Sequence, residues 1–338
     1  MSQDTMDAGV VVAPGRFDVE VRPAIEFVPK GWVLIDVCAV GLCGTDYHIL
    51  EGKHPFLEYP RVIGHELSGR VATDASGWAA GDLVVVNPYL SCGTCRACLR
   101  GKPNCCSKIE VLGVHRDGGL TRQLAVPAGN LYAATGLTPT QAAMVEFLAI
   151  GAHAVRRSEV GLRDRVLVTG VGPIGIGTAL FARLKGAEVT LLDLSAGRLK
   201  MAAESFGFNQ GFTDIDAAIA STQGDGFDVV FDATGFVGAI EEGFRAVGHG
   251  GTYTLVSVVK ESIRFSDPEF HKREMRLIGS RNALKVDFDW VMTAFREGHI
   301  NADALCSKVI SLPDLQQSFG DLAADRTDMI KVIVSLQD

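Results

Sequence analysis

Long apolar runs are missing from this sequence, and aromatic residues are few. No segment approaches 18 uninterrupted apolar residues, which excludes a transmembrane helix, and aromatic side chains make up only 7% of the 338 residues. Residues 1–9 show no basic stretch followed by an apolar run, so we expect no signal peptide. Basic charge is not in excess either. The 32 lysines and arginines stand against 40 acidic residues, a net charge of −8, which argues against a nucleic-acid-binding surface.

Cysteine is also too scarce for a disulfide scaffold, with eight residues in the whole chain. Five of them lie within the fifteen residues 92–106, and the spacing of four of these indicates a metal site, so we expect a reducing compartment, the cytoplasm. Apolar residues are abundant and make up 47% of the chain, and there are 38 glycines. This composition excludes intrinsic disorder and is typical of a soluble α/β protein, and the length predicts two domains.

The two parts of the chain differ in their pattern. Residues 1 to about 150 are β-rich, with short β-branched runs bounded by Gly and Pro. Strands and helices then alternate, which predicts a parallel sheet covered on both faces. The last fifty or so residues are expected to be irregular and to end in a strand. In the alternating part we expect strands over 165–169, 188–192, 227–231 and 251–256, with helices over 174–185 and 198–205. The strand at the end of the chain is expected over 330–334.

A dinucleotide-binding motif lies where the alternation begins. Gly170-Val171-Gly172-Pro173-Ile174-Gly175 fits G-x-G-x-x-G, follows a predicted strand, opens a predicted helix, and precedes Asp193 at the end of the next strand. The glycines allow the backbone to approach a pyrophosphate, which the helix N-terminus attracts. Asp193 would accept hydrogen bonds from the adenosine ribose and repel a 2′-phosphate, so we predict NAD rather than NADP. Arg198 either weakens this preference or is a solvated helix charge.

The crowded cysteines predict a structural zinc site. Cys92, Cys95, Cys98 and Cys106 form C-x2-C-x2-C-x7-C, and four thiolates at this spacing can close a tetrahedral shell with no open position. Cys105 neighbours Cys106, and only one of the two can fill the fourth position. Such a site holds a loop in place and performs no chemistry.

A second set of metal ligands precedes the cysteine segment. Cys43 lies in GLCGTDYH (residues 41–48), and His65 and Glu66 lie in GHE. Cysteine, histidine and a carboxylate are the ligands of an open catalytic zinc, where substrate takes a remaining position. Together with a nucleotide motif downstream, they predict a zinc-dependent oxidoreductase.

With these motifs the chain resembles the medium-chain zinc-dependent alcohol and polyol dehydrogenases. The resemblance includes VEFLAIGAHA (residues 145–154) and runs nearly end to end. It implies a GroES-like β-rich catalytic domain and a Rossmann domain with a doubly wound parallel sheet. We expect the GroES-like domain over 1–149 and 283–338, with the zinc lobe at about 88–110, and the Rossmann domain over 150–282.

The resemblance also implies roles for individual residues. Cys43, His65 and Glu66 would surround the catalytic zinc, with Asp46 orienting His65. Glu146 stands where alcohol dehydrogenases usually have a second cysteine, as in the sorbitol and sugar-acid branch. The third ligand is therefore either Glu66 or Glu146.

The same resemblance gives a proton path. Thr45 matches the hydroxyl residue that takes the alcohol proton, and His48 matches the outer end of the relay. A hydroxyl beside the reacting oxygen can pass its proton through the ribose hydroxyl to an imidazole that titrates near neutral pH.

Two loops narrow the substrate class. VLGVHRDGG (residues 111–119) and LIGSRNA (residues 277–283) look most like bacterial sugar-acid oxidoreductases of the L-galactonate 5-dehydrogenase kind. His115 or Arg116 either faces the substrate, where Arg116 would suit a carboxylate, or lies in solvent. We predict an enzyme that uses zinc and NAD to oxidise a secondary alcohol of a polyol or sugar acid.

Three alternatives remain: a small-alcohol or butanediol-type dehydrogenase, a non-catalytic nucleotide-binding protein, and a zinc-ribbon nucleic-acid binder. The intact Cys43, His65 and Thr45 argue against the second, and the net charge against the third. For the leading interpretation we expect a small-molecule substrate, no nucleic-acid or membrane partner, and assembly into a homodimer or homotetramer.

Overall fold

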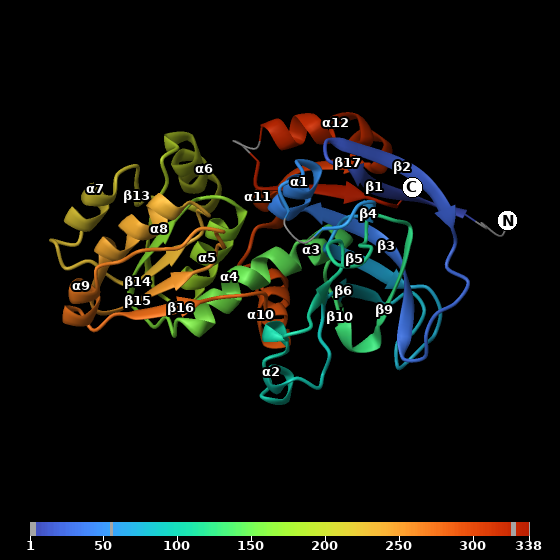
Figure 1. Cartoon of the computed structure of the whole chain (residues 1–338), viewed down its shortest axis with the longest axis horizontal. Helices are drawn as coiled ribbons and strands as arrows, with labels where there is room; N and C mark the ends of the chain where they lie inside the picture. Colours follow the sequence, from blue (N-terminus) through green and yellow to red (C-terminus); the bar gives the residue numbers. More distant parts are fainter. Residues whose placement is uncertain (1–4, 55–56, 326–328, 338) are drawn as a thin grey trace. The chain divides into compact units, whose positions relative to one another are not determined.

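The computed structural model describes residues 5–54, 57–325 and 329–337. Residues 1–4 lie outside the described residues. They belong to the N-terminal segment in which we expect no signal peptide. The structure divides into two compact units (Figure 1). Unit 1 contains Met1–Glu146, Met292–Gly298 and Leu305–Asp338, and unit 2 contains Phe147–Val291 and His299–Ala304. The domain boundaries expected at residues 150 and 283 stay a prediction.

Unit 1 is built on β-sheets. Its strands are β1 (Thr5–Ala13), β2 (Arg16–Pro23), β3 (Trp32–Leu42), β4 (Arg61–Val62), β5 (Glu66–Val71), β6 (Leu83–Val86), β7 (Tyr89–Leu90), β8 (Glu110–Val111), β9 (Gln123–Pro127), β10 (Leu131–Ala133), β17 (Cys306–Ser311) and β18 (Lys331–Ser335). Among the described residues, the largest sheet of this unit has the order β10-β6-β5-β3-β18-β17, with β9 also paired to β3. Strands from both ends of the sequence therefore lie next to each other, because β18 pairs with β3.

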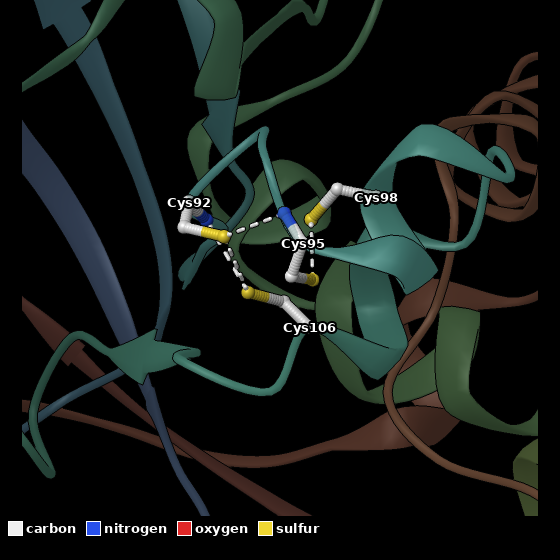
Figure 2. A group of neighbouring side chains, drawn as sticks. All are labelled: Cys92, Cys95, Cys98 and Cys106. Carbon is white, nitrogen blue, oxygen red and sulfur yellow. Dashed lines mark hydrogen bonds between the residues drawn. The ribbon is translucent and has the colours of Figure 1, made fainter.

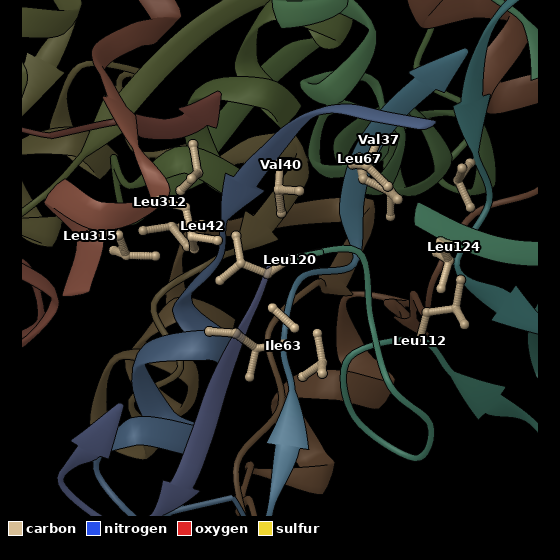
Figure 3. Close-up of a cluster of buried hydrophobic side chains, with 14 of the residues drawn as sticks. Val37, Val40, Leu42, Ile63, Leu67, Leu112, Leu120, Leu124, Leu312 and Leu315 are labelled. Carbon is tan, nitrogen blue, oxygen red and sulfur yellow. The ribbon is translucent and has the colours of Figure 1, made fainter. Parts of the chain in front are cut away.

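The core of unit 1 lies between this sheet and the elements packed on it. Buried side chains of β3 and β5 pack against residues of the loop before β9, of β9 itself and of the helix over Leu312–Ala324 (Figure 3). Burying one Leu- or Val-sized side chain contributes about 1.5–3 kcal/mol. The buried residues labelled in the figure are Val37, Val40, Leu42, Ile63, Leu67, Leu112, Leu120, Leu124, Leu312 and Leu315.

Helices of unit 1 are short, apart from the last. They are α1 (Gly44–Leu50), α2 (Arg96–Leu99), α3 (Pro139–Ala143) and α12 (Leu312–Ala324), with 3-10 turns η1 (Pro103–Cys105) and η2 (Ala128–Asn130). Three further helices contain residues of both units: α4 (Val145–Arg157), α10 (Lys285–Arg296) and α11 (Ala302–Leu305).

The prediction that the last fifty or so residues are irregular is wrong, because this region contains α12, α11 and most of α10. Pro313 and Gly320 suggest breaks in the sequence, but Pro313 lies in the first turn of α12, where a proline loses no helical hydrogen bond. The side chain of Ser311 caps this helix by accepting a hydrogen bond from the amide of Asp314 at 3.2 Å. The buried face follows the helical period through Leu312, Leu315, Phe319 and Leu322.

Unit 2 contains one parallel sheet. Its strands are β11 (Arg165–Thr169), β12 (Glu188–Leu192), β13 (Gly211–Phe212), β14 (Phe227–Asp232), β15 (Val247–Leu255) and β16 (Arg276–Gly279). They lie in the order β13-β12-β11-β14-β15-β16, and every described pairing is parallel. The four strands expected from the sequence are found, although β15 begins at Val247 rather than at residue 251, and β13 and β16 were not expected. This order confirms the predicted Rossmann-type sheet, with its switch point between β11 and β14.

Helices connect these strands. They are α5 (Pro173–Leu184), α6 (Ala196–Phe206), α7 (Ile215–Ala220), α8 (Val237–Gly243) and α9 (Asp267–Lys272), with the 3-10 turn η3 (Phe244–Ala246). Because right-handed crossovers run in opposite directions from the switch point, α5 and α8 cover opposite faces of the sheet. Among the described residues, no helix has both the length and the apolar character needed to cross a bilayer.

Candidate active site

The predicted ligands Cys43, His65 and Glu66 meet in unit 1. Cys43 is the N-cap residue of α1, directly after β3, and Glu66 opens β5. The antiparallel pairing of these strands sets Gly41 opposite Glu66, which brings the two ends together. One donor atom from each of the three residues lies within 4.8 Å of the others. His65 and Glu66 are buried and Cys43 is partly exposed, so the group has one open side.

Asp46 fixes the backbone around this group. One carboxylate oxygen accepts the Cys43 amide at 2.8 Å, and the other accepts the Gly64 amide at 3.3 Å. The latter oxygen lies 3.8 Å from Nδ1 of His65, beyond hydrogen-bond distance. Asp46 therefore acts on His65 through its charge. Burial alone would lower the pKa of His65, but the charges of Asp46 and Cys43 raise this pKa well above its usual value.

Lys331 is a member of this site that the sequence analysis missed. It opens β18, is only 2% exposed, and donates to the Leu42 carbonyl at 3.1 Å and to Oε1 of Glu66 at 2.7 Å. Its ammonium nitrogen also lies 2.5 Å from Oε2 of Glu66 as an ion pair, without hydrogen-bond geometry to that oxygen. Burial would lower the pKa of Lys331, but the charge of Glu66 raises it. The sequence signal that could have indicated this residue is a single lysine at the start of an otherwise apolar strand.

Glu146 is buried in the first turn of α4 and is not part of the three-donor group. Tyr89, also missed from the sequence, is buried and donates a hydrogen bond from its hydroxyl to Oε1 of Glu146. Burial raises the pKa of Glu146 to about 7, against the lowering charge of His65, and the nearby charge of Glu66 raises it further. Burial and the Glu146 charge raise the pKa of Tyr89 well above its usual value.

The predicted relay residues lie on α1. Oγ1 of Thr45 is 3.8 Å from Sγ of Cys43, and Thr45 is partly buried. His48 follows three residues later on the same helix, hence on the same face, and is exposed. The helix therefore runs from the metal-ligand group at Thr45 to solvent at His48.

The four cysteines of the predicted structural site converge in unit 1 (Figure 2). Cys92 and Cys106 have their sulfurs 3.5 Å apart, as do Cys95 and Cys98. All four are free thiols, and Cys106, not the exposed Cys105, joins the other three. Hydrogen bonds, the largest from the Cys98 amide, lower the pKa of Cys95 to about 5.

The nucleotide motif is at the switch point of unit 2. Gly170, after β11, has φ +88°, and a side chain at Gly175 would overlap the Gly170 carbonyl oxygen, so both positions need glycine. Gly172 is the N-cap of α5, with Pro173 in its first turn, and the free amides of Ile174 and Gly175 follow.

Asp193 supports this loop from the end of β12. Its Oδ2 accepts the Val171 amide at 2.7 Å, and its Oδ1 accepts the Ser195 amide at 2.8 Å. Arg198 approaches Asp193 to 3.8 Å. Leu194, which the sequence analysis did not single out, is 91% exposed beside Asp193 and offers an apolar surface.

The loop of His115 and Arg116 makes contacts of its own. Arg116 pairs with Glu110 at 3.0 Å and lies over the ring of Trp32 at 5.9 Å. Nδ1 of His115 accepts the Val111 amide at 3.1 Å. Arg116 therefore contacts a residue of its own loop and the first residue of β3. These contacts do not support the expectation that Arg116 binds a substrate carboxylate.

Both donor sets fit zinc. A tetrahedral zinc–thiolate shell with bonds of about 2.3 Å has sulfurs about 3.8 Å apart, close to the 3.5 Å separations of the cysteine cluster. In the second group, Nδ1 of His65 and Oε2 of Glu66 are buried without a hydrogen-bond partner among the described residues. Buried polar atoms without partners are costly, and a metal cation at this group would join the Lys331 ammonium as a partner of the Glu66 carboxylate.

Comparisons with known proteins agree with this geometry. The family model for the alcohol dehydrogenase GroES-like domain matches residues 29–136, and that for zinc-binding dehydrogenase matches residues 173–297. L-galactonate-5-dehydrogenase of Escherichia coli (strain K12) is 38% identical over 309 residues, covering 89% of this chain and 91% of its own. Sorbitol dehydrogenase of Halalkalibacterium halodurans is 30% identical over 334 residues, covering 95% and 96%.

A solved structure extends the agreement to the whole fold. An alcohol dehydrogenase from Escherichia coli CFT073, complexed with NADH, superposes with a TM-score of 0.92 at 26% identity and covers 98% of this chain and 100% of its own. These matches confirm the GroES-like and Rossmann assignments. The chain belongs to the zinc-dependent medium-chain alcohol and polyol dehydrogenases and is an oxidoreductase.

Proposed function

We propose that this enzyme oxidises a secondary hydroxyl of a polyol or of a sugar acid such as L-galactonate, with NAD as hydride acceptor. The observation that carries the proposal is the open Cys43–His65–Glu66 donor group with a second buried carboxylate, Glu146, within electrostatic reach. The similarity to dehydrogenases of L-galactonate and sorbitol supports the substrate class.

Cys43, His65 and Glu66 would hold the catalytic zinc. Glu66 takes the third position in this proposal because its carboxylate lies with the other two donors, whereas Glu146 does not. A zinc ion held there polarises the substrate hydroxyl and lowers its pKa. Cys92, Cys95, Cys98 and Cys106 would hold a structural zinc in a closed thiolate shell.

Thr45 and His48 would carry the proton. The Thr45 hydroxyl would accept the substrate's hydroxyl proton while it passes its own proton on along the relay, and His48, exposed on the same helix face, would release one proton to solvent. The carbon that carried the hydroxyl gives its hydride to NAD. The products are a ketone, NADH and one proton.

The glycine loop and Asp193 would bind NAD. The loop places free amides at the pyrophosphate, and Asp193 would accept the ribose hydroxyls while the exposed Leu194 packs against the adenine. We propose Gly170, Gly172, Pro173, Ile174 and Gly175 as the phosphate loop, with Arg198 at its edge. Cytoplasmic location and assembly into a homodimer or homotetramer stay predictions.

Changing Asp193 to alanine tests the cofactor choice. Loss of the ribose contacts should lower kcat/KM for NAD about tenfold or more, in keeping with about 1.5–3 kcal/mol for a charge-assisted hydrogen bond. Because Asp193 also holds the Val171 amide, a disturbed loop would weaken NAD and NADP equally. The decisive value is therefore the NADP-to-NAD efficiency ratio, which should rise.

Asp214→Ala is a matched control, since this aspartate caps α7 through the Ala217 amide at 2.9 Å. It removes a carboxylate from the same unit without touching the loop, and the ratio should stay at the wild-type value. An unchanged ratio in Asp193→Ala would show that Asp193 does not select the cofactor.

Initial rates of NADH formation over a panel of polyols, aldonates and simple alcohols test the proposed function. We expect the highest kcat/KM with a polyol or sugar acid and little activity with ethanol. Equal efficiency on ethanol and on every sugar acid would contradict the substrate class and favour a small-alcohol dehydrogenase.

A further inference from the structure

We propose that Tyr89 is a substrate-positioning residue: its hydroxyl holds one carboxylate oxygen of Glu146, so that the other oxygen accepts a second hydroxyl of the substrate. This inference rests on the proposed function and deepens it. In this proposal the enzyme prefers polyhydroxylated substrates because the pair of Tyr89 and Glu146 binds a second substrate hydroxyl.

The backbone of Tyr89 is fixed from several sides. Its amide donates to Oδ1 of Asn87 at 3.1 Å, and its carbonyl accepts Nδ2 of Asn130 at 3.1 Å. The strand β7 that carries it pairs with β8, with Tyr89 opposite Val111. A side chain on so constrained a backbone holds its hydroxyl in one place, which is what a positioning role requires.

The two buried carboxylates of the site have different partners. Glu66 is bound by the ammonium of Lys331, which neutralises its charge. Glu146 receives the neutral Tyr89 hydroxyl on Oε1, and among the residues that the structure describes no hydrogen bond reaches its Oε2. In its ionised form Glu146 has about four acceptor sites. Its Oε2 is not among the buried polar atoms that lack a partner, so this oxygen is open to a ligand that brings a hydroxyl donor.

A substrate with a hydroxyl on the neighbouring carbon supplies such a donor, whereas a monohydroxy alcohol does not. Sites built to bond a hydroxyl reject analogues that lack it, because the buried acceptor is then left unpaired. Tyr89 contributes by fixing the direction of Glu146. Without the phenolic hydroxyl, Glu146 loses the hydrogen bond on Oε1 and is free to turn away from the substrate.

Tyr89→Phe tests the proposal, with 2,3-butanediol and 2-butanol as probes that differ by one vicinal hydroxyl. The wild-type preference for the diol, measured as the ratio of kcat/KM or of inhibition constants against a polyol substrate, should fall about tenfold, the worth of one charged hydrogen bond. Zinc release to a chromophoric chelator should be as slow as in the wild type, because Cys43, His65 and Glu66 are unchanged. Faster zinc release with equal losses on both probes would indicate a collapsed site and overturn the proposal.

Tyr132→Phe is the matched control. Tyr132 is buried to the same degree, and its hydroxyl accepts Nδ2 of Asn87 at 2.9 Å. The diol preference should stay at the wild-type value in this variant. An equal loss in both variants would show general loosening of the loop and contradict a direct role for Tyr89.

Glu146→Gln provides a second test that does not depend on folding of the Tyr89 variant. It should lower the diol preference as well, and the double variant should lose little more than either single one, since both act through one contact. Additive losses would overturn the proposal. A wild-type enzyme with no preference for any polyol would instead refute the proposed function, whatever the variants do.

Discussion

Replacing Thr45 by valine should lower turnover by about 10²–10⁴-fold, the usual contribution of a general acid–base step. Valine keeps the branched shape beside Cys43, so zinc content and NAD affinity should stay close to those of the wild type. The hydroxyl that accepts the substrate proton is lost. Because hydroxide can take over part of this task, the residual rate should rise with pH. The measurement is kcat against pH, with zinc content determined on the same samples.

Thr45→Ser is the matched control, because it keeps the hydroxyl and should retain most of the turnover. His48→Ala should have a milder effect than Thr45→Val, since water can replace an exposed end of the relay. If Thr45→Val turned over at the wild-type rate with both metals bound, the proton would leave by another route, and Glu66 and Glu146 would be the next candidates.

Replacing Lys331 by methionine should destabilise the protein strongly. The change leaves the fully buried carboxylate of Glu66 without its cation, and breaking a buried ion pair on one side typically costs about 3–5 kcal/mol. The loss should be largest after the catalytic zinc has been removed, because bound zinc also compensates the charge of Glu66. The measurement is urea unfolding of the loaded and chelator-treated protein.

Two variants separate this effect from a general loss of charge. Lys285→Met removes an exposed ion pair with Asp289 and should change the free energy of unfolding by less than about 1 kcal/mol. Combining Lys331→Met with Glu66→Gln removes both charges and should recover much of the stability. An unfolding midpoint of Lys331→Met equal to that of the wild type would contradict the role assigned to this lysine.

Local sequence signals predicted the parts of the structure in which neighbouring residues decide the outcome. The strand before Gly170, the helix after it and Asp193 at the end of β12 are one continuous βαβ pattern, and the structure has them where expected. The four cysteines lie within one loop, so their spacing alone constrains them to meet. Only the choice between Cys105 and Cys106 required the structure.

Contacts between distant segments could not be predicted in this way. Lys331 pairs with Glu66 across 265 positions, and Tyr89 meets Glu146 across 57, with no motif joining either pair. In isolation, the sequence around Lys331 resembles the end of a strand with a solvated lysine. Only the pairing of β18 with β3 places this side chain beneath the metal-ligand group. The helix α12 was not predicted because Pro313 and Gly320 are residues that usually interrupt helices. Packing of its buried face on the core of unit 1 stabilises it.

Timed chelation of the freshly purified enzyme tests the central claim most directly. Zinc content, NAD-linked activity and far-UV circular dichroism are followed on one sample. We predict two zinc ions per chain at the start. Mild chelation should remove the one at the open Cys43 site together with the activity, while the closed thiolate site keeps its metal and the fold persists. Re-added zinc should restore turnover. A folded, active enzyme with a single zinc, or full activity after the first zinc has left, would contradict the account.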